Sequence, residues 1–321
     1  MKKKNLQSLV SIIILAVVLI ALSEMKLVST SKLLVLQYIG IYSIMVVGIN
    51  IVNGYMGIFS LAHPGFMAVG AYAAALCSKY CFTTVYLYPL CLLAGGIAAM
   101  CVGLLVAVPS FKSKGDYLAI ITLGFTLMVQ SILQNAEIVG ASRGMTNISK
   151  FTSLYWVYAC LVLAVVIAGR FINSKYGRSL KAIREDEMAT ELVSVNVRHA
   201  KTVAFGVSAF LIGVSGALLC HLLGYTSPSS YGYSNVVDGL VMVYIGGVGS
   251  ITGSITGAVI WQLLVQMLKG LGTWRWVVGG ALLCLVMIFL PKGIFGYQEI
   301  GEALRDLKKH DIHKSGGEAR S

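Results

Sequence analysis

The residues best suited to chemistry lie in one short stretch, 170–201, between two long apolar stretches. It contains seven basic and four acidic residues. Lys181 and Arg184 precede Glu185 and Glu187, which is the reverse of the order that the dipole of a single helix favours. We therefore expect these charges to meet something outside their own helix. A solvated loop that only fixes the membrane topology is the alternative.

Two further features of this stretch bear on its structure. Ser174 or Ser179 could cap a helix, since serine is a preferred N-cap residue. A strip of apolar side chains could lie along the same helix, formed by Leu180, Ile183, Met188 and Leu192.

Polar side chains also occur in small groups within otherwise apolar sequence. Buried amides and hydroxyls need hydrogen-bond partners, so bonds between helices are the leading interpretation, and contact with a substrate is the alternative. The groups are Asn50 with Asn53, Ser60 with His63, and Gln130 with Gln134 and Asn135.

Glycines form a second pattern. Gly249, Gly253 and Gly257 recur every four positions, a spacing that lets helix backbones approach closely in a membrane. The run from Gly246 to Gly249 could instead break a helix and expose backbone groups to a translocation pathway. Packing is the leading interpretation.

Much chemistry is missing from the sequence. No Gly-Lys dipeptide is present, so a P-loop for ATP is excluded, and His-Glu-x-x-His is absent as well. The seven cysteines are scattered, odd in number and without a Cys-x-x-Cys pair, which argues against a disulfide framework or a zinc site. Asp238 is the one candidate intramembrane carboxylate, whereas ion-coupled carriers usually use several. We expect neither an enzyme nor a chain that binds a metal or cofactor.

The elements that position these residues follow from composition. Apolar residues make up 57% of the 321 residues and charged residues 12%, and the mean hydropathy is +0.81. A soluble protein cannot bury this much apolar surface, and disorder requires low hydrophobicity. The net charge of +12 lies in short segments between apolar runs, as the positive-inside rule describes. The fold class is therefore an all-α polytopic membrane protein, and a nucleic-acid partner is not expected.

Charge-free runs predict about ten transmembrane helices, with eight or nine as alternatives. The run 33–78 is expected to hold two helices joined near residues 53–57, and the run 239–268 either one long helix or two short ones. Residues 1–23 read as a first span or signal anchor. An even number of spans places both termini in the cytoplasm with the basic segment 170–201. The transmembrane domain is then 1–291, and 292–321 is a short charged cytoplasmic tail.

Several segments resemble the permease subunits of ABC importers for branched-chain amino acids, the LivM-type family. Phe59–Tyr72 resembles the family's Ser-Leu-Gly-His-x-x-Phe-x-x-x-Gly-Ala-Tyr segment, and Gly115–Phe125 its Gly-x-Tyr-x-Ala-Ile-x-Thr-Leu segment. Tyr176–Glu187 is the most specific likeness. Gly246–Ala258 resembles the family's glycine-rich segment, with Ser254 in place of a proline. These segments come in the family's order, and the likeness covers residues 40–296.

The resemblance implies a permease subunit in a bacterial inner membrane that carries branched-chain or other hydrophobic amino acids. It implies a second permease subunit, identical or different, two cytoplasmic ATP-binding subunits that hold ATP-Mg, and a periplasmic substrate-binding protein. Within segment 174–201, residues 178–192 would form a cytoplasmic coupling helix between spans six and seven. The residues implied to couple to the ATPase are Gly177, Arg178, Ser179, Lys181, Ala182, Ile183, Arg184, Glu185, Asp186, Glu187 and Glu191.

Polar and glycine positions in the matching segments are the candidates for the substrate pathway. They are Ser60, His63, Thr122, Gly246, Gly247, Gly249 and Ser250. A zwitterion with an apolar side chain needs local polarity for its charged ends and small or apolar walls elsewhere.

Departures from the family pattern leave the substrate open. Leu127 and Gln130 stand where the family has Glu and Arg, and Gly140–Gly144 differs from the family's glycine-rich stretch. Related permeases carry ribose, other sugars, urea or amides. The alternatives are thus the same kind of importer with such a substrate, or a self-sufficient carrier or channel.

Overall fold

The computed structural model describes residues 30–80, 85–111, 116–272, 274–289 and 293. Most of these residues are helical, and the β-pairing among them is a bridge between Met145 and Thr226. The all-α prediction is confirmed for this part of the chain. The predicted first span, 1–23, and the tail, 292–321 apart from Gly293, lie outside the described residues.

Nine helices of 14 residues or more build the described bundle. They are α2 (Thr30–Asn50), α3 (His63–Tyr80), α4 (Tyr88–Ser110), α5 (Asp116–Asn135), α6 (Leu154–Asn173), α9 (Val197–Leu223), α10 (Tyr233–Gly246), α11 (Ile251–Met267) and α12 (Trp274–Phe289). Among the described residues, five stretches are long and apolar enough to cross a membrane: Ser31–Tyr55, Tyr88–Ser110, Tyr117–Asn135, Leu154–Asn173 and Val197–Leu223. The chain is a polytopic all-α membrane protein.

Short helical elements join the long helices. The π-helix η1 (Ile51–Tyr55) extends α2, and two short α-helices, α7 (Lys175–Glu185) and α8 (Glu187–Leu192), connect α6 to α9. The remaining connections contain 3-10 turns, namely η2 (Val85–Leu87), η3 (Glu137–Val139), η4 (Ala141–Arg143), η5 (Pro228–Tyr231) and η6 (Leu268–Leu271).

The two ambiguous charge-free runs each hold two helices. In the run 33–78, η1 ends at Tyr55 and α3 begins at His63, so the join starts inside the predicted interval and extends beyond it. In the run 239–268, α10 ends at Gly246 and α11 begins at Ile251. The two-helix alternative is therefore right there, and Asp238 lies within α10.

Helix α9 lies at the centre of the bundle. In its most apolar 18-residue stretch 83% of the residues are buried, against 33–39% in the corresponding stretches of α4, α5 and α6. Its glycines let neighbours approach at backbone distance. A Cβ on Gly216 would overlap the carbonyl of Met67 in α3, and one on Gly70 would overlap the backbone of Gly213 in α9. Glycines at these positions therefore serve the close helix packing that is common in membrane proteins.

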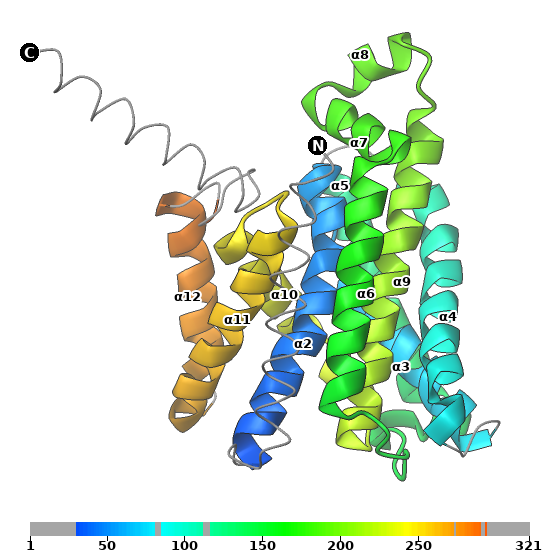
Figure 1. The fold of residues 1–321 in the computed structure, drawn as a ribbon, viewed down its shortest axis with the longest axis vertical. Helices are drawn as coiled ribbons and strands as arrows, with labels where there is room; N and C mark the ends of the chain where they lie inside the picture. Colours follow the sequence, from blue (N-terminus) through cyan, green and yellow to red (C-terminus); the bar gives the residue numbers. More distant parts are fainter. Residues whose placement is uncertain (1–29, 81–84, 112–115, 273, 290–292, 294–321) are drawn as a thin grey trace, which may run out of the picture.

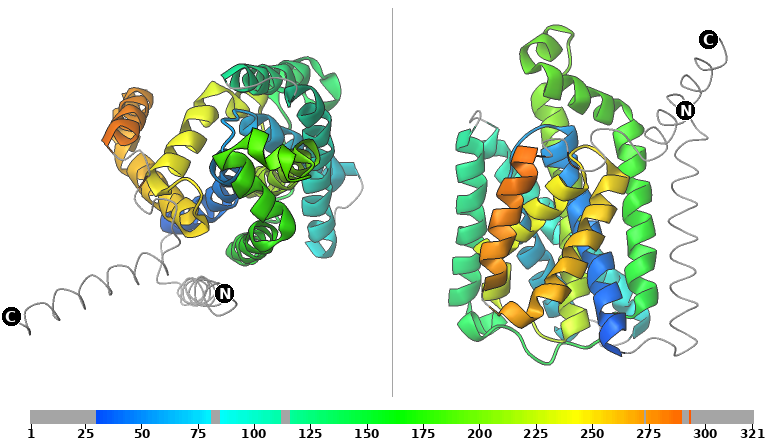
Figure 2. Two further views of the ribbon diagram at one scale, coloured as in Figure 1. Left: turned by 90° about the horizontal axis from the view of Figure 1, so that it is seen from above. Right: turned by 90° about the vertical axis from the view of Figure 1, so that its left-hand side faces the viewer.

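The helices are arranged unevenly around the bundle, and the short helices α7 and α8 lie at one of its ends. Helices α11 and α12 lie on the side away from α4 and α5 (Figures 1 and 2). Helices α7 and α8 stand at one end, above the long helices in Figure 1. The turn between α10 and α11 lies toward this same end, so the most charged segment and the glycine run are near each other along the bundle axis.

Candidate functional site

Helix α7 turns sharply away from α6 and rests on the bundle. Its N-cap residue Ser174 is extended, and Ser174 Oγ donates to the carbonyl of Phe171 at 2.6 Å rather than capping α7. A Cβ on Gly177 would overlap the carbonyl of Ile172, so the turn requires glycine. Leu180 and Ile183 are buried, 0% and 5% exposed, and anchor one face of α7.

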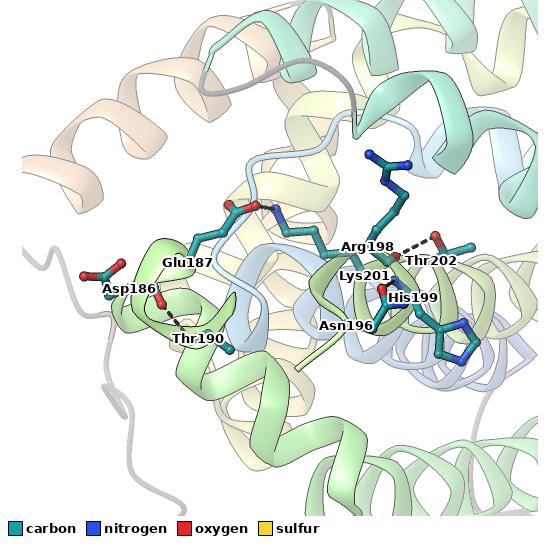
Figure 3. Close-up of polar contacts among 8 residues, drawn as sticks. All are labelled: Asp186, Glu187, Thr190, Asn196, Arg198, His199, Lys201 and Thr202. Carbon is teal, nitrogen blue, oxygen red and sulfur yellow. Dashed lines mark hydrogen bonds and ion pairs between the residues drawn. The ribbon is translucent and has the colours of Figure 1, made fainter. Parts of the chain in front are cut away.

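The predicted single helix over 178–192 is two helices broken at Asp186. Asp186 is extended and caps α8: its Oδ1 accepts from the amide of Ala189 at 3.0 Å, and its carbonyl accepts from Thr190 Oγ1 at 2.6 Å (Figure 3). Arg184 is then in the last turn of α7 and Glu187 in the first turn of α8. The order of charges therefore suits two helix dipoles instead of opposing one, which corrects the expectation drawn for a single helix.

Helix α8 is fixed to the start of α9. Lys201 Nζ lies 2.7 Å from Glu187 Oε1, and Asn196 Oδ1 caps α9 by accepting from the amide of His199 at 2.9 Å (Figure 3). Between them Ser194 has a positive φ of 61°. Part of the charge in this stretch is thus satisfied within the chain.

The structure separates the predicted coupling residues by exposure. Six are exposed: Arg178, Lys181, Ala182, Glu185, Asp186 and Glu191. Ser179, Arg184 and Glu187 are partly buried, whereas Gly177 and Ile183 are buried and face this chain's own helices. The last two can position α7 but cannot themselves be reached by a partner.

The predicted apolar strip divides at the break. Leu180 and Ile183 are buried, whereas Met188 and Leu192 are 70% and 87% exposed, and the neighbouring Val193 is 72% exposed. Helix α8 thus presents apolar side chains to its surroundings at the tip of a charged segment. Val193 was not singled out from the sequence, although it continues the apolar pattern by one residue.

The candidate pathway residues fall into two groups. Ser60 and His63 line a small cavity together with Asn53 and Ser208 and apolar side chains. His63 Nε2 lies 3.1 Å from the carbonyl of Asn235 in α10. Thr122 is outside this lining; its Oγ1 accepts from the amide of Leu61 at 2.9 Å and so holds the loop that carries Ser60.

The second group is the turn from Gly246 to Ser250, which the side chain of Asn50 holds in place. Asn50 Oδ1 accepts from the amide of Gly249 at 2.7 Å, and Asn50 Nδ2 donates to the carbonyl of Ser250 at 2.9 Å. Gly247 and Gly249 have positive φ angles of 130° and 87°. The glycine run therefore breaks the helix, and the pathway role of its backbone groups stays a prediction. Gly253 and Gly257 pack α11 against α10, so the packing interpretation holds for these two glycines.

The grouped polar residues differ in role. Asn50 bonds between helices as predicted, whereas Asn53 bonds locally to Ser60, with both distances 3.3 Å. Asn135 is exposed and donates to the carbonyl of Ser131 in its own helix. The interpretation as interhelical bonding is therefore right for Asn50 and wrong for Asn135.

Two other kinds of site, a nucleophilic serine and a metal site, have little support in the described part of the chain. Residues 140–144 spell Gly-x-Ser-x-Gly, but they form 3-10 turns rather than a strand-to-helix elbow, and Ser142 Oγ donates to the carbonyl of Gln134. Across the described residues, no three side chains of His, Cys, Asp and Glu come together as a metal site.

Comparison with known proteins gives a consistent result. The sequence model for the family described as branched-chain amino acid transport system / permease component matches residues 32–291. The high-affinity branched-chain amino acid transport system permease protein LivM of Escherichia coli K12 is 30% identical over 289 residues, covering 79% of this chain and 67% of the relative. LivH of the same kind of system in Salmonella typhimurium is 25% identical, covering 81% and 92%. The xylose transport system permease protein XylH of Haemophilus influenzae is 33% identical over 142 residues, covering 40% and 38%. No solved structure matches.

Proposed function

This chain belongs to the permease family of branched-chain amino acid transport systems, and from this premise we propose that it is the membrane-spanning subunit of an ATP-driven importer. It carries branched-chain or other hydrophobic amino acids across a bacterial inner membrane. The observation that carries the proposal is the family match over residues 32–291, which takes in the described helices from α2 to α12.

Energy enters the importer through α7 and α8. ATP-Mg is bound and hydrolysed on two separate cytoplasmic subunits, and the coupling segment 174–201 contacts them. The exposed apolar tip of α8 and the exposed charges of α7 support this role, since a helix inserted into a groove presents apolar anchors within a polar rim. Movement of the ATP-binding subunits then favours one state of the permease over another.

The remaining assembly and topology follow the same scheme. A second permease subunit, identical or different, completes the membrane part, and a periplasmic binding protein delivers the substrate. We place ten spans in residues 1–291, with both termini and the tail 292–321 in the cytoplasm. Supporting this, α2 starts at the end of the bundle opposite α7, and α12 finishes at the end where α7 lies (Figure 1).

The test of coupling is a change at the tip of α8. Leu192→Asp places a carboxylate on a side chain that is 87% exposed, so folding is unaffected while docking is lost. We expect uptake of radiolabelled leucine, by cells relying on this transporter, to fall at least tenfold with membrane insertion intact. Arg184→Glu and Glu187→Arg are expected to abolish uptake too.

Asn173→Asp is the matched control, because Asn173 is an exposed residue at the end of α6 and lies outside the proposed docking residues. Its uptake should equal that of the wild type. Normal uptake by Leu192→Asp would contradict the coupling role of α8.

A sugar is the second candidate substrate, because the xylose permease relative is 33% identical over part of the chain. Calorimetric titration of the periplasmic binding protein with leucine and with xylose decides between the two.

A self-sufficient carrier is a weaker alternative. Among the described residues, the buried side chains of histidine, lysine, arginine, aspartate and glutamate are His63, His221 and Lys201, with no carboxylate. Uptake by the chain without ATP-binding subunits would support that alternative.

A further inference from the structure

Direct contacts lead from α7 into η1, the π-helical end of α2. Arg184 Nη1 donates to the carbonyl of Gly54 at 2.9 Å. Gly57 follows η1 with a φ of +72°, and a Cβ there would lie 2.7 Å from Arg184 Cγ, so the stem of the arginine packs closely on this backbone. Single π-turns are often found at functional positions. Helix α7 therefore rests on an irregular, buried turn.

The same turn lies against the loop between α10 and α11. A Cβ on Gly54 would overlap Asn50 Oδ1 and would lie 2.6 Å from the amide nitrogen of Gly249. Glycine at position 54 thus allows η1 to touch α7 through its carbonyl and the α10–α11 loop through its Cα. A shift of α7 cannot move Gly54 without pressing on or releasing Gly249.

Asn50 makes this contact a clamp. Its side chain, in a residue 1% exposed, accepts from the amide of Gly249 at 2.7 Å. Its amide nitrogen, with two hydrogens to donate, lies within hydrogen-bond distance of three acceptors in α11 and the loop before it: Ser254 Oγ at 2.6 Å, the carbonyl of Ser250 at 2.9 Å and the carbonyl of Gly247 at 3.3 Å. Buried amide bonds of this kind are costly to break without replacement.

The clamped loop belongs to a tight helical hairpin. A Cβ on Gly246 would overlap the carbonyl of Gly253, and one on Gly257 would overlap the carbonyl of Met242. With backbones this close, α10 and α11 cannot slide past each other independently. A displacement of the loop is therefore passed to both helices.

We propose that Asn50 is a positioning residue that links the coupling segment to the α10–α11 hairpin, through Arg184 and Gly54. Movement of α7 shifts η1, and the clamp of Asn50 transmits the shift to the hairpin. Helices α10 and α11 are then the part of this subunit whose position changes most directly with the nucleotide state of the ATP-binding subunits. The inference rests on the proposed role of α7 and α8.

The test follows amide hydrogen exchange by mass spectrometry in the assembled transporter, held in lipid nanodiscs without nucleotide or trapped with ATP and vanadate. In the wild type, the exchange rate of residues 247–254 should differ about tenfold or more between the two states. Asn50→Leu and Arg184→Gln should remove this difference while the nucleotide-dependent change at residues 187–193 persists. Arg170→Gln, which removes a charge at an exposed residue in the last turn of α6 and outside segment 174–201, is the matched control and should behave as the wild type.

Two results would overturn the link: no nucleotide-dependent change at 247–254 in the wild type, or an undiminished change in both variants. Should Asn50→Leu fail to assemble, Arg184→Gln decides alone, because it leaves the Asn50 bonds in place. A wild type without any change at 187–193 would instead contradict the coupling role of α7 and α8, so the two failures are distinguishable.

Discussion

Lys201 and Glu187 form an ion pair whose partners are unequally buried. The Lys201 side chain is 9% exposed and the Glu187 side chain 44%. Removing the carboxylate leaves a buried ammonium without its counterion, whereas removing the ammonium leaves a carboxylate that water can solvate. Loss of the Glu187 carboxylate should therefore destabilise the fold more than loss of the Lys201 ammonium.

We expect Glu187→Gln to lower the free energy of unfolding by about 2 kcal/mol. Lys201→Met, which keeps the buried apolar stem, should cost less than about 1 kcal/mol. Thermal unfolding of both purified variants in one detergent measures the difference. The Lys201→Met variant being the less stable of the two would contradict this account of the pair.

Among the elements, the interface between α3 and α9 depends most visibly on glycine. Gly216 faces the backbone of Met67, where a Cβ would overlap, whereas Gly124 in α5 has nothing within 4 Å of its Cβ position. The two glycines are both inside helices, so they share the same intrinsic helix propensity and differ in what surrounds them.

Gly216→Ala is therefore expected to destabilise the protein by about 1–3 kcal/mol, because α3 and α9 must separate. Gly124→Ala should be neutral or stabilise it by up to about 1 kcal/mol, since alanine favours helix without meeting a neighbour. Thermal unfolding in detergent compares the two with the wild type. Equal effects would show that helix propensity, not close packing, sets the role of Gly216.

The sequence predicted elements well where charge marks their ends and less well where tertiary contacts decide. The charge-free run 117–136 contains all but the first residue of α5, and the run 151–169 contains most of α6, which continues past Arg170 to Asn173. The break at Asp186 was missed, although aspartate followed by Glu187 is a typical helix start. The clamp of Asn50 on Gly249 joins residues 199 positions apart, and a single sequence carries no signal for such a pairing.

For the molecule as a whole, scarce membrane charge and one crowded charged segment belong together. Among the described helices, the candidate intramembrane carboxylate is Asp238 in α10, which is only partly buried, whereas ion-coupled carriers usually use several such groups. Segment 174–201, by contrast, stands at one end of the bundle with exposed charges and an exposed apolar tip. The proposed coupling role requires that the segment face the cytoplasm, where ATP is available, and that the loop 136–153 face the opposite side.

That requirement can be tested with two serines separated by one crossing of the membrane, α6. Ser142 and Ser194 are both exposed, and each is replaced by cysteine in turn. A membrane-impermeant maleimide added to spheroplasts should label Ser142→Cys but not Ser194→Cys, and inverted vesicles should reverse the result, since basic segments stay in the cytoplasm. Peptide mass spectrometry assigns each label, so the native cysteines need not be removed. Labelling of both positions from one side would mean that α6 does not cross the membrane.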